Sequence, residues 1–155
     1  MRGQHEILAI LGDVLSNELT AINQYTLHAG TCAHWGYERL ATKFRGEAQD
    51  ERGHADLVIK RILFLEGTPD MQRYHTVQGG KTVREQLEAN LALEHVAIGI
   101  LEPGIALARQ LGDNGTEALL VDILVSEQAG VDWIEAQLHQ LRELGEPLYL
   151  AQQIS

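Results

Sequence analysis

Four long stretches of this chain repeat apolar side chains at steps of three and four residues, which is the spacing of one buried face of an α-helix. They run from residue 7 to about 34, from 40 to 65, from about 82 to 111 and from 120 to 141. Short turns separate the members of each pair, whereas residues 67–81 form a long connection without a helical period. The sequence therefore predicts an all-α four-helix bundle, made of two antiparallel hairpins joined by a long crossover.

Helix-breaking residues support the predicted ends of the helices. The second stretch stops at Gly67-Thr68-Pro69, and the residues at 112–115 read as the turn of the second hairpin. Pro103 lies inside the third stretch, where we expect it to kink the helix. The tail from Pro147 to Ile154 is predicted to form a short fifth helix. A chain of 155 residues has the length of one domain, so a single domain over residues 1–155 is expected.

The two hairpins repeat each other weakly. A shift of 76 residues aligns apolar positions and turns of one hairpin with those of the other: Leu11 with Leu87, Leu15 with Leu91, Ile22 with Ile98, Gly36 with Gly112 and Leu65 with Leu141. The same shift aligns Glu18 with Glu94 and Glu51 with Glu127. Each of these acids lies inside an apolar stripe, so we expect all four carboxylates to point into the bundle.

The four acids are also expected at one level of the bundle. In an antiparallel hairpin, two residues at the same level lie equally far from the turn. The midpoint of Glu18 and Glu51 falls between residues 34 and 35, and that of Glu94 and Glu127 falls between residues 110 and 111. Both midpoints coincide with predicted turns, so the four side chains should share one layer.

Four ionised carboxylates in an apolar layer need compensation, because burying an unpaired charge costs several kcal/mol. They could be protonated, pair with arginine or bind metal. No Lys or Arg lies beside them in the stripes, whereas two divalent cations would balance four negative charges. His54 adds an imidazole three residues after Glu51, and Glu-x-x-His with glutamates from neighbouring helices is the arrangement of carboxylate-bridged di-iron bundles. Oxygen-rich donors with few nitrogens suit iron or manganese.

The second half of the repeat lacks its imidazole, because Gly130 occupies the position that corresponds to His54. Four side chains would form the first metal position: Glu18, Glu51, His54 and Glu127. The second would keep Glu94 and the two bridging carboxylates, Glu51 and Glu127, and no neighbouring residue offers a convincing replacement for the histidine. Such a centre could be inactive, mononuclear, or weaker only at its second metal.

The charge balance favours cations as ligands. The chain has 22 acidic and 12 basic side chains, a formal charge of −10, and no cluster of Lys and Arg that would follow a phosphate backbone. We therefore expect no nucleic acid partner. The single Cys32 cannot form an intrachain disulfide, and the sequence shows neither an export signal nor an obvious membrane span. A cytoplasmic protein without a membrane partner is expected.

Several short motifs resemble those of the bacterioferritins, and the resemblance covers essentially the whole chain. They are Asn17-Glu18-Leu19, Ala21-Ile22-Asn23-Gln24-Tyr25, His54-Ala55-Asp56, Arg61-Ile62-Leu63-Phe64-Leu65-Glu66-Gly67, Leu91-Ala92-Leu93-Glu94, Asp132-Trp133-Ile134-Glu135 and Tyr149-Leu150-Ala151-Gln152-Gln153-Ile154. The resemblance implies a ferritin-like bundle with a short fifth helix. It also implies that twenty-four subunits assemble into a hollow shell, which oxidises Fe(II) and stores it as ferric mineral.

Residue-for-residue matching to this family implies five ferroxidase ligands: Glu18, Glu51, His54, Glu94 and Glu127. Gly130 takes the place of the sixth ligand. Tyr25 matches a tyrosine beside the centre. Asp50 matches an acidic position that the family uses for iron on the inner surface of the shell, although Gly46 replaces the histidine that accompanies it.

Arg52 occupies the position of the methionine through which bacterioferritins bind haem between two subunits. An arginine is always charged and offers no sulfur donor, so no haem is expected from this subunit alone. The chain resembles the subunit type that lacks the haem ligand, and it could co-assemble with a second, haem-binding subunit.

These observations predict an iron-storage subunit with ferroxidase activity that the loss of the sixth ligand could impair. Two other functions stay open. One is a weakly active structural subunit of a mixed shell, and the other is a di-iron or di-manganese oxidase or peroxidase. The sequence distinguishes neither O₂ from peroxide as the oxidant nor a homo-oligomer from a hetero-oligomer.

Overall fold

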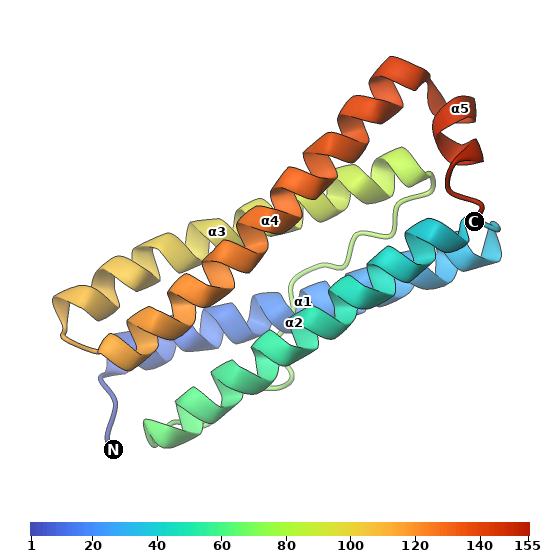
Figure 1. Cartoon of the computed structure of the whole chain (residues 1–155). Coiled ribbons are helices and arrows are strands. Elements are labelled where there is room, and N and C mark those ends of the chain that lie inside the picture. Colours follow the sequence, from blue (N-terminus) through green and yellow to red (C-terminus); the bar gives the residue numbers. More distant parts are fainter.

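Five helices and no strand make up the computed structural model, which describes all residues from 1 to 155 (Figure 1). The helices are α1 (His5–His34), α2 (Glu38–Phe64), α3 (Val83–Gln110), α4 (Asn114–Leu144) and α5 (Glu146–Ala151). The prediction of an all-α ferritin-like bundle with a short fifth helix is confirmed. The turn between α3 and α4 is shorter than predicted, because Asp113 already caps the start of α4. Pro103 does not end α3, which continues through it as one helix.

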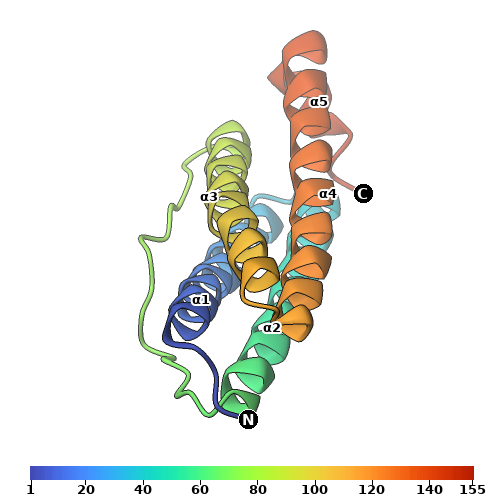
Figure 2. The ribbon, with the colours of Figure 1, turned by 90° about the vertical axis from the view of Figure 1, so that its left-hand side faces the viewer.

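The helices pair as two hairpins that lie on one another. α1 packs along α2, α3 packs along α4, and the hairpins meet mainly through α1 and α3. The crossover between α2 and α3 runs along the side of α1 and α3 that faces away from α2 and α4 (Figure 2). At the other side, α5 folds back on α4 and buries Tyr149, whose hydroxyl donates to Gln137 Oε1 at 2.8 Å.

A polar layer divides the hydrophobic core into two apolar clusters. One cluster includes Leu11, Val58, Leu101 and Leu120, and the other includes Tyr25, Phe44, Leu87 and Leu141. Every long helix carries a single buried glutamate, which on α2, α3 and α4 lies between the residues of the first cluster and those of the second. The packing of the bundle therefore brings four acids from four helices toward one level.

A ladder of buried polar side chains on α1 holds the crossover in place. Ser16 Oγ donates to the carbonyl of Arg73 at 2.9 Å, and Thr20 Oγ1 accepts from the amide of His75 at 2.9 Å. Gln24 Oε1 accepts from the amide of Gln78 at 3.0 Å. His28 completes the ladder at the same four-residue spacing: Ser16, Thr20, Gln24 and His28. These contacts satisfy backbone groups of a segment that forms no helix of its own.

α3 is the one helix that is long and apolar enough to cross a membrane, judged by length and composition alone. Inside the bundle it packs on α1 and α4. It carries three buried polar side chains, Gln86, Asn90 and Glu94. Core helices of soluble bundles share these properties, so the feature is compatible with an interior helix of this fold.

Candidate metal centre

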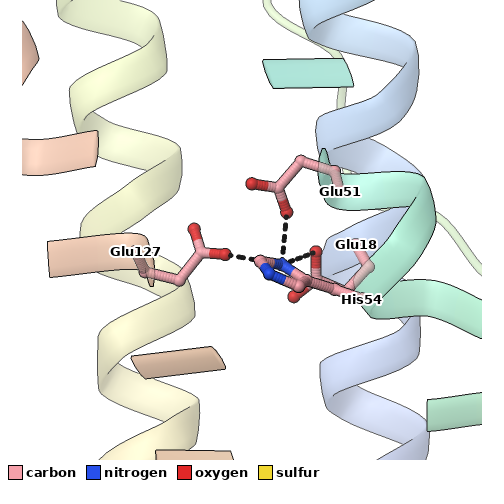
Figure 3. A group of neighbouring side chains, drawn as sticks. All are labelled: Glu18, Glu51, His54 and Glu127. Atoms are coloured by element: carbon pink, nitrogen blue, oxygen red, sulfur yellow. Dashed lines mark ion pairs between the residues drawn. The ribbon is translucent and has the colours of Figure 1, made fainter. Parts of the chain in front are cut away.

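Three long helices bring four of the predicted ligands together in the polar layer (Figure 3). Glu18 comes from α1, Glu51 and His54 come from α2, and Glu127 comes from α4. One ligand atom from each lies within 4.8 Å of the others. The imidazole is at the centre: His54 Nδ1 is 3.3 Å from Glu127 Oε1 and 3.6 Å from one oxygen each of Glu18 and Glu51.

Glu94 adds a fourth carboxylate from α3 at the neighbouring end of the layer. It does not belong to the group around His54 but lies with Glu51, to which one of its carboxylate oxygens comes within 4.8 Å. The hydroxyl of Tyr25, on α1, donates to Glu94 Oε1 at 2.6 Å and fixes this side chain. Glu51 is thus shared between two groups of donors, as expected of a carboxylate that bridges two cations.

Four of the predicted ligands are buried and His54 is half-buried, and each has a buried polar atom without a hydrogen-bond partner. Such atoms occur on all five side chains: Glu18 Oε2, Glu51 Oε2, His54 Nδ1, Glu94 Oε2 and Glu127 Oε1. The four glutamates are at most 3% exposed. Buried polar atoms in native proteins normally have a partner, and an exception calls for a specific reason such as a bound ion. Elsewhere in the chain only Asn17 and Asn90 have such an atom.

Burial raises the pKa of the carboxyl groups of Glu18, Glu51 and Glu127 above the usual range. For Glu94, burial and the neighbouring Glu127 raise the pKa to about 10, although the Tyr25 hydroxyl acts in the opposite direction. Burial would lower the pKa of His54, but contacts with three carboxylates outweigh it and raise that pKa to about 12. The layer therefore keeps protons that a divalent cation would displace on binding.

The donor set fits iron or manganese. Four carboxylates and one imidazole offer hard oxygen donors with a single nitrogen, which suits divalent cations of intermediate hardness. Two divalent cations would balance the four carboxylates and remove the cost of burying them unpaired. No lysine or arginine forms an ion pair with Glu18, Glu51, Glu94 or Glu127.

Comparison with known proteins decides the family. A family model described as a ferritin-like domain matches residues 8–144. A bacterioferritin of Mycobacterium leprae is 42% identical over 155 residues, which are 100% of this chain and 98% of the relative. The chain belongs to the bacterioferritin family. A bacterioferritin of Streptomyces coelicolor is 40% identical over 97% of this chain and 90% of its own. A bacterioferritin of Brucella melitensis is 38% identical over 96% of this chain and 92% of its own.

In this bacterioferritin chain, Gly130 faces the Glu94 end of the layer. A Cβ atom built on Gly130 would lie 3.3 Å from Glu94 Oε1 and 3.4 Å from its carboxyl carbon. A side chain at position 130 would therefore extend toward the Glu94 carboxylate. This is the place where the internal repeat predicts the missing imidazole. An added side chain would require Glu94 to move by a few tenths of an ångström.

Glu47 also lies in the layer, although it is not among the five ligands predicted from the sequence. Its side chain is only 16% exposed. One carboxylate oxygen of Glu47 lies within 4.8 Å of ligand atoms of both Glu51 and Glu94. The signal was present in the spacing, because a residue four positions before Glu51 lies on the same face of a helix.

The other two predicted positions on α2 lie outside this layer. Asp50 and Arg52 flank Glu51, and both are exposed. Arg52 lines an open groove between α1 and α2 together with Ile22 and Thr26. Neither side chain takes part in the group around His54, so the chain presents them to solvent or to other subunits.

Proposed function

We propose that this bacterioferritin chain is an iron-storage subunit that binds Fe(II) in the polar layer and oxidises it there. One observation carries the proposal: five side chains of one layer each have a buried polar atom without a hydrogen-bond partner, namely Glu18, Glu51, His54, Glu94 and Glu127. Membership of the bacterioferritin family supports the same function. Fe(II) is the substrate, and its electrons pass to O₂ or to peroxide.

Each side chain has a distinct role in this proposal. Glu18 and His54 would bind the first cation, and Glu94 would bind the second. Glu51 and Glu127 would bridge the two, because Glu51 already belongs to both donor groups. Tyr25 would act as a positioning residue, since its hydroxyl holds Glu94 at 2.6 Å.

Storage requires the product to leave the layer for a cavity. The family supports assembly of the chain into a hollow shell, for which we propose twenty-four subunits in the cytoplasm. A formal charge of −10 per chain lowers the cost of collecting cations inside such a shell. The exposed carboxylate of Asp50 would provide an iron site on the inner surface. Because Arg52 replaces the haem ligand, haem would come only from a second subunit type.

A weakly active structural subunit in a mixed shell is the second candidate function, and Gly130 is the observation in its favour. The oxidase or peroxidase alternative is less well supported. The space beside Glu18, between Val14, Ala97 and Leu101, is too small to admit a water-sized sphere. Pockets for organic substrates usually measure roughly 300–1,000 Å³. This part of the layer therefore has no room for an organic substrate.

The test is the initial rate of aerobic Fe(II) oxidation by the assembled protein, followed by ferric absorbance. Glu18→Gln removes a donor from the group around His54, and we expect the rate to fall by about 10- to 100-fold, as for other losses at metal sites. Glu38→Gln makes the same chemical change at an exposed position of α2 and should leave the rate unaltered. Equal rates for all three proteins would contradict the proposal.

A further inference from the structure

We propose that Glu47 replaces the missing imidazole and acts as a ligand of the second cation, so that this position is made of carboxylates alone. The inference rests on the proposed function, because it assumes that the layer binds two cations. It assigns a role to a residue outside the five predicted ligands. It also supplies a donor for the cation position that lacks an imidazole at residue 130.

The geometry supports a second donor group on the far side of Glu51 from His54. Glu47, Glu51 and Glu94 each place one carboxylate oxygen within 4.8 Å of the others. Glu47 and Glu51 lie one turn apart on α2, whereas Glu94 reaches the group from α3. Three carboxylates from two helices therefore converge on one point, where their mutual repulsion favours binding of protons or of a cation.

One orphaned atom distinguishes this group from an ordinary acidic patch. Glu94 Oε2 is buried and lacks any hydrogen-bond partner, on a side chain that is 3% exposed. The other oxygen of Glu94 accepts from Tyr25, and Glu51 Oε2 faces His54 at 3.6 Å. Gly130 brings no side chain to the Glu94 end of the layer. A cation held between Glu47, Glu51 and Glu94 would satisfy Glu94 Oε2.

Lys43 keeps Glu47 in position at the edge of the layer. Its Nζ atom lies 2.9 Å from Glu47 Oε1, and the ammonium also sits 4.8 Å from the centre of the Trp133 ring. The pair occupies one oxygen of Glu47 and leaves the other for a cation. Because Glu47 is half-buried and the other acids are buried, it is also the donor of this group that lies nearest the solvent.

The chemistry of the two positions should then differ. The first has an imidazole, which raises affinity for later transition metals, whereas the second offers oxygen alone, which suits hard cations. Such asymmetry would let the second position release its ion more readily. In a storage protein this favours the transfer of iron out of the layer.

The test is anaerobic titration of the assembled protein with Co(II), a redox-stable stand-in for Fe(II), followed by visible absorbance and calorimetry. Wild type should bind two Co(II) per subunit in the layer. Glu47→Gln should keep the first equivalent unchanged and weaken the second by about 10- to 100-fold. Glu38→Gln is the matched control and should bind as wild type does. Glu47→Gln combined with Gly130→His should recover the second equivalent.

Each result bears on the inference differently. If Glu47→Gln binds both equivalents like wild type, then Glu47 is not a ligand, and the proposed function stands. If wild type binds a single Co(II), no second position exists and the inference is wrong. If wild type binds none in the layer, the proposed function fails as well. Retention of the first equivalent shows that the variant is folded; should it be lost, Glu47→Ala provides the same comparison.

Discussion

At the residue scale, the polar layer could be predicted because buried charge is costly and therefore conspicuous in a sequence. Glu18, Glu51, Glu94 and Glu127 interrupt apolar stripes, and the internal repeat aligned them at one level. Glu47 escaped prediction because the Lys43–Glu47 pair has the i,i+4 spacing of an ordinary surface ion pair. Only the packing of α3 against the hairpin shows that this carboxylate reaches Glu94.

Gly130→His should strengthen the second cation position and speed Fe(II) oxidation. The new imidazole would start from a Cβ that lies 3.3 Å from Glu94 Oε1, and the substitution should also recover about 0.5 kcal/mol of helix propensity. Calorimetry with Co(II) and stopped-flow oxidation with Fe(II) measure the two effects. Gly130→Ala adds the same Cβ contact with Glu94 without a ligand, so the difference between the two variants isolates the effect of the imidazole. An unchanged second affinity in the histidine variant would show that position 130 does not serve the metal.

At the scale of elements, the helices and their turns followed from periodicity, whereas the contacts that lock them together did not. The predicted crossover at residues 67–81 has no helix, as expected, but its attachment to the polar ladder on α1 was not visible in the sequence. The hydrogen bond between the His28 ring and the carbonyl of Gln78 is likewise absent from any pattern in the sequence. Such long-range polar contacts depend on which faces meet, and periodicity reports only that a face is buried.

The start of α4 is tied to the end of α2 by a second polar cluster. Asp113 caps α4 by accepting from the amide of Thr116 at 3.0 Å, and Arg61 donates to Asp113 Oδ1 at 2.6 Å. Gly115 admits the guanidinium, because a Cβ there would lie 2.7 Å from the Arg61 nitrogens. The cluster joins the two hairpins at the end of the bundle remote from α5.

Asp113→Ala should destabilise the subunit by about 1–2 kcal/mol at neutral pH, since it removes both the cap and the partner of Arg61. Partial burial opposes ionisation, but Thr116 and Arg61 hold the pKa of Asp113 below its ordinary value of 3.8. The stabilisation that ionised Asp113 gives the folded subunit is therefore complete above pH 3.8. It is lost as the pH falls through the lower pKa of the folded state. Thermal unfolding at pH 7 and at acid pH measures the difference, and Asp122→Ala is the exposed control on α4. A difference from wild type that stays constant down to acid pH would contradict this account.

At the scale of the whole molecule, every helix carries exposed apolar side chains. They include Leu27 on α1, Leu57, Leu63 and Phe64 on α2, Val96 on α3, Val125 on α4 and Leu148 on α5. Assembly into a shell would bury those that lie where subunits meet. The single ferritin-like domain over residues 1–155 and the shell of twenty-four subunits stay predictions, which the mass of the native protein can test.

The native protein should be a large hollow assembly. Its mass, measured by native mass spectrometry or light scattering, is expected near twenty-four times the 17.2 kDa of one chain. Electron microscopy should show a central cavity that fills with ferric mineral when iron is supplied. A stable monomer or simple dimer would rule out the storage function.

The homo-oligomer should contain no haem bound by two methionines. Arg52 is exposed on α2, where it lines the groove with Ile22 and Thr26, and it brings a positive charge in place of a thioether. The absorbance spectrum of the reduced protein measures this directly. Sharp low-spin haem bands at half an equivalent per subunit would show that the alignment at position 52 is wrong.

The central claim is that the buried layer binds the iron that the protein oxidises, and anomalous diffraction at the iron edge tests it most directly. Crystals loaded anaerobically with Fe(II) should show one peak between Glu18, Glu51, His54 and Glu127 and a second, weaker peak toward Glu94. In crystals of Glu18→Gln, the peak between Glu18, Glu51, His54 and Glu127 should be absent or strongly reduced. Iron found only at exposed acids such as Asp50, with the layer free of anomalous density, would contradict the account.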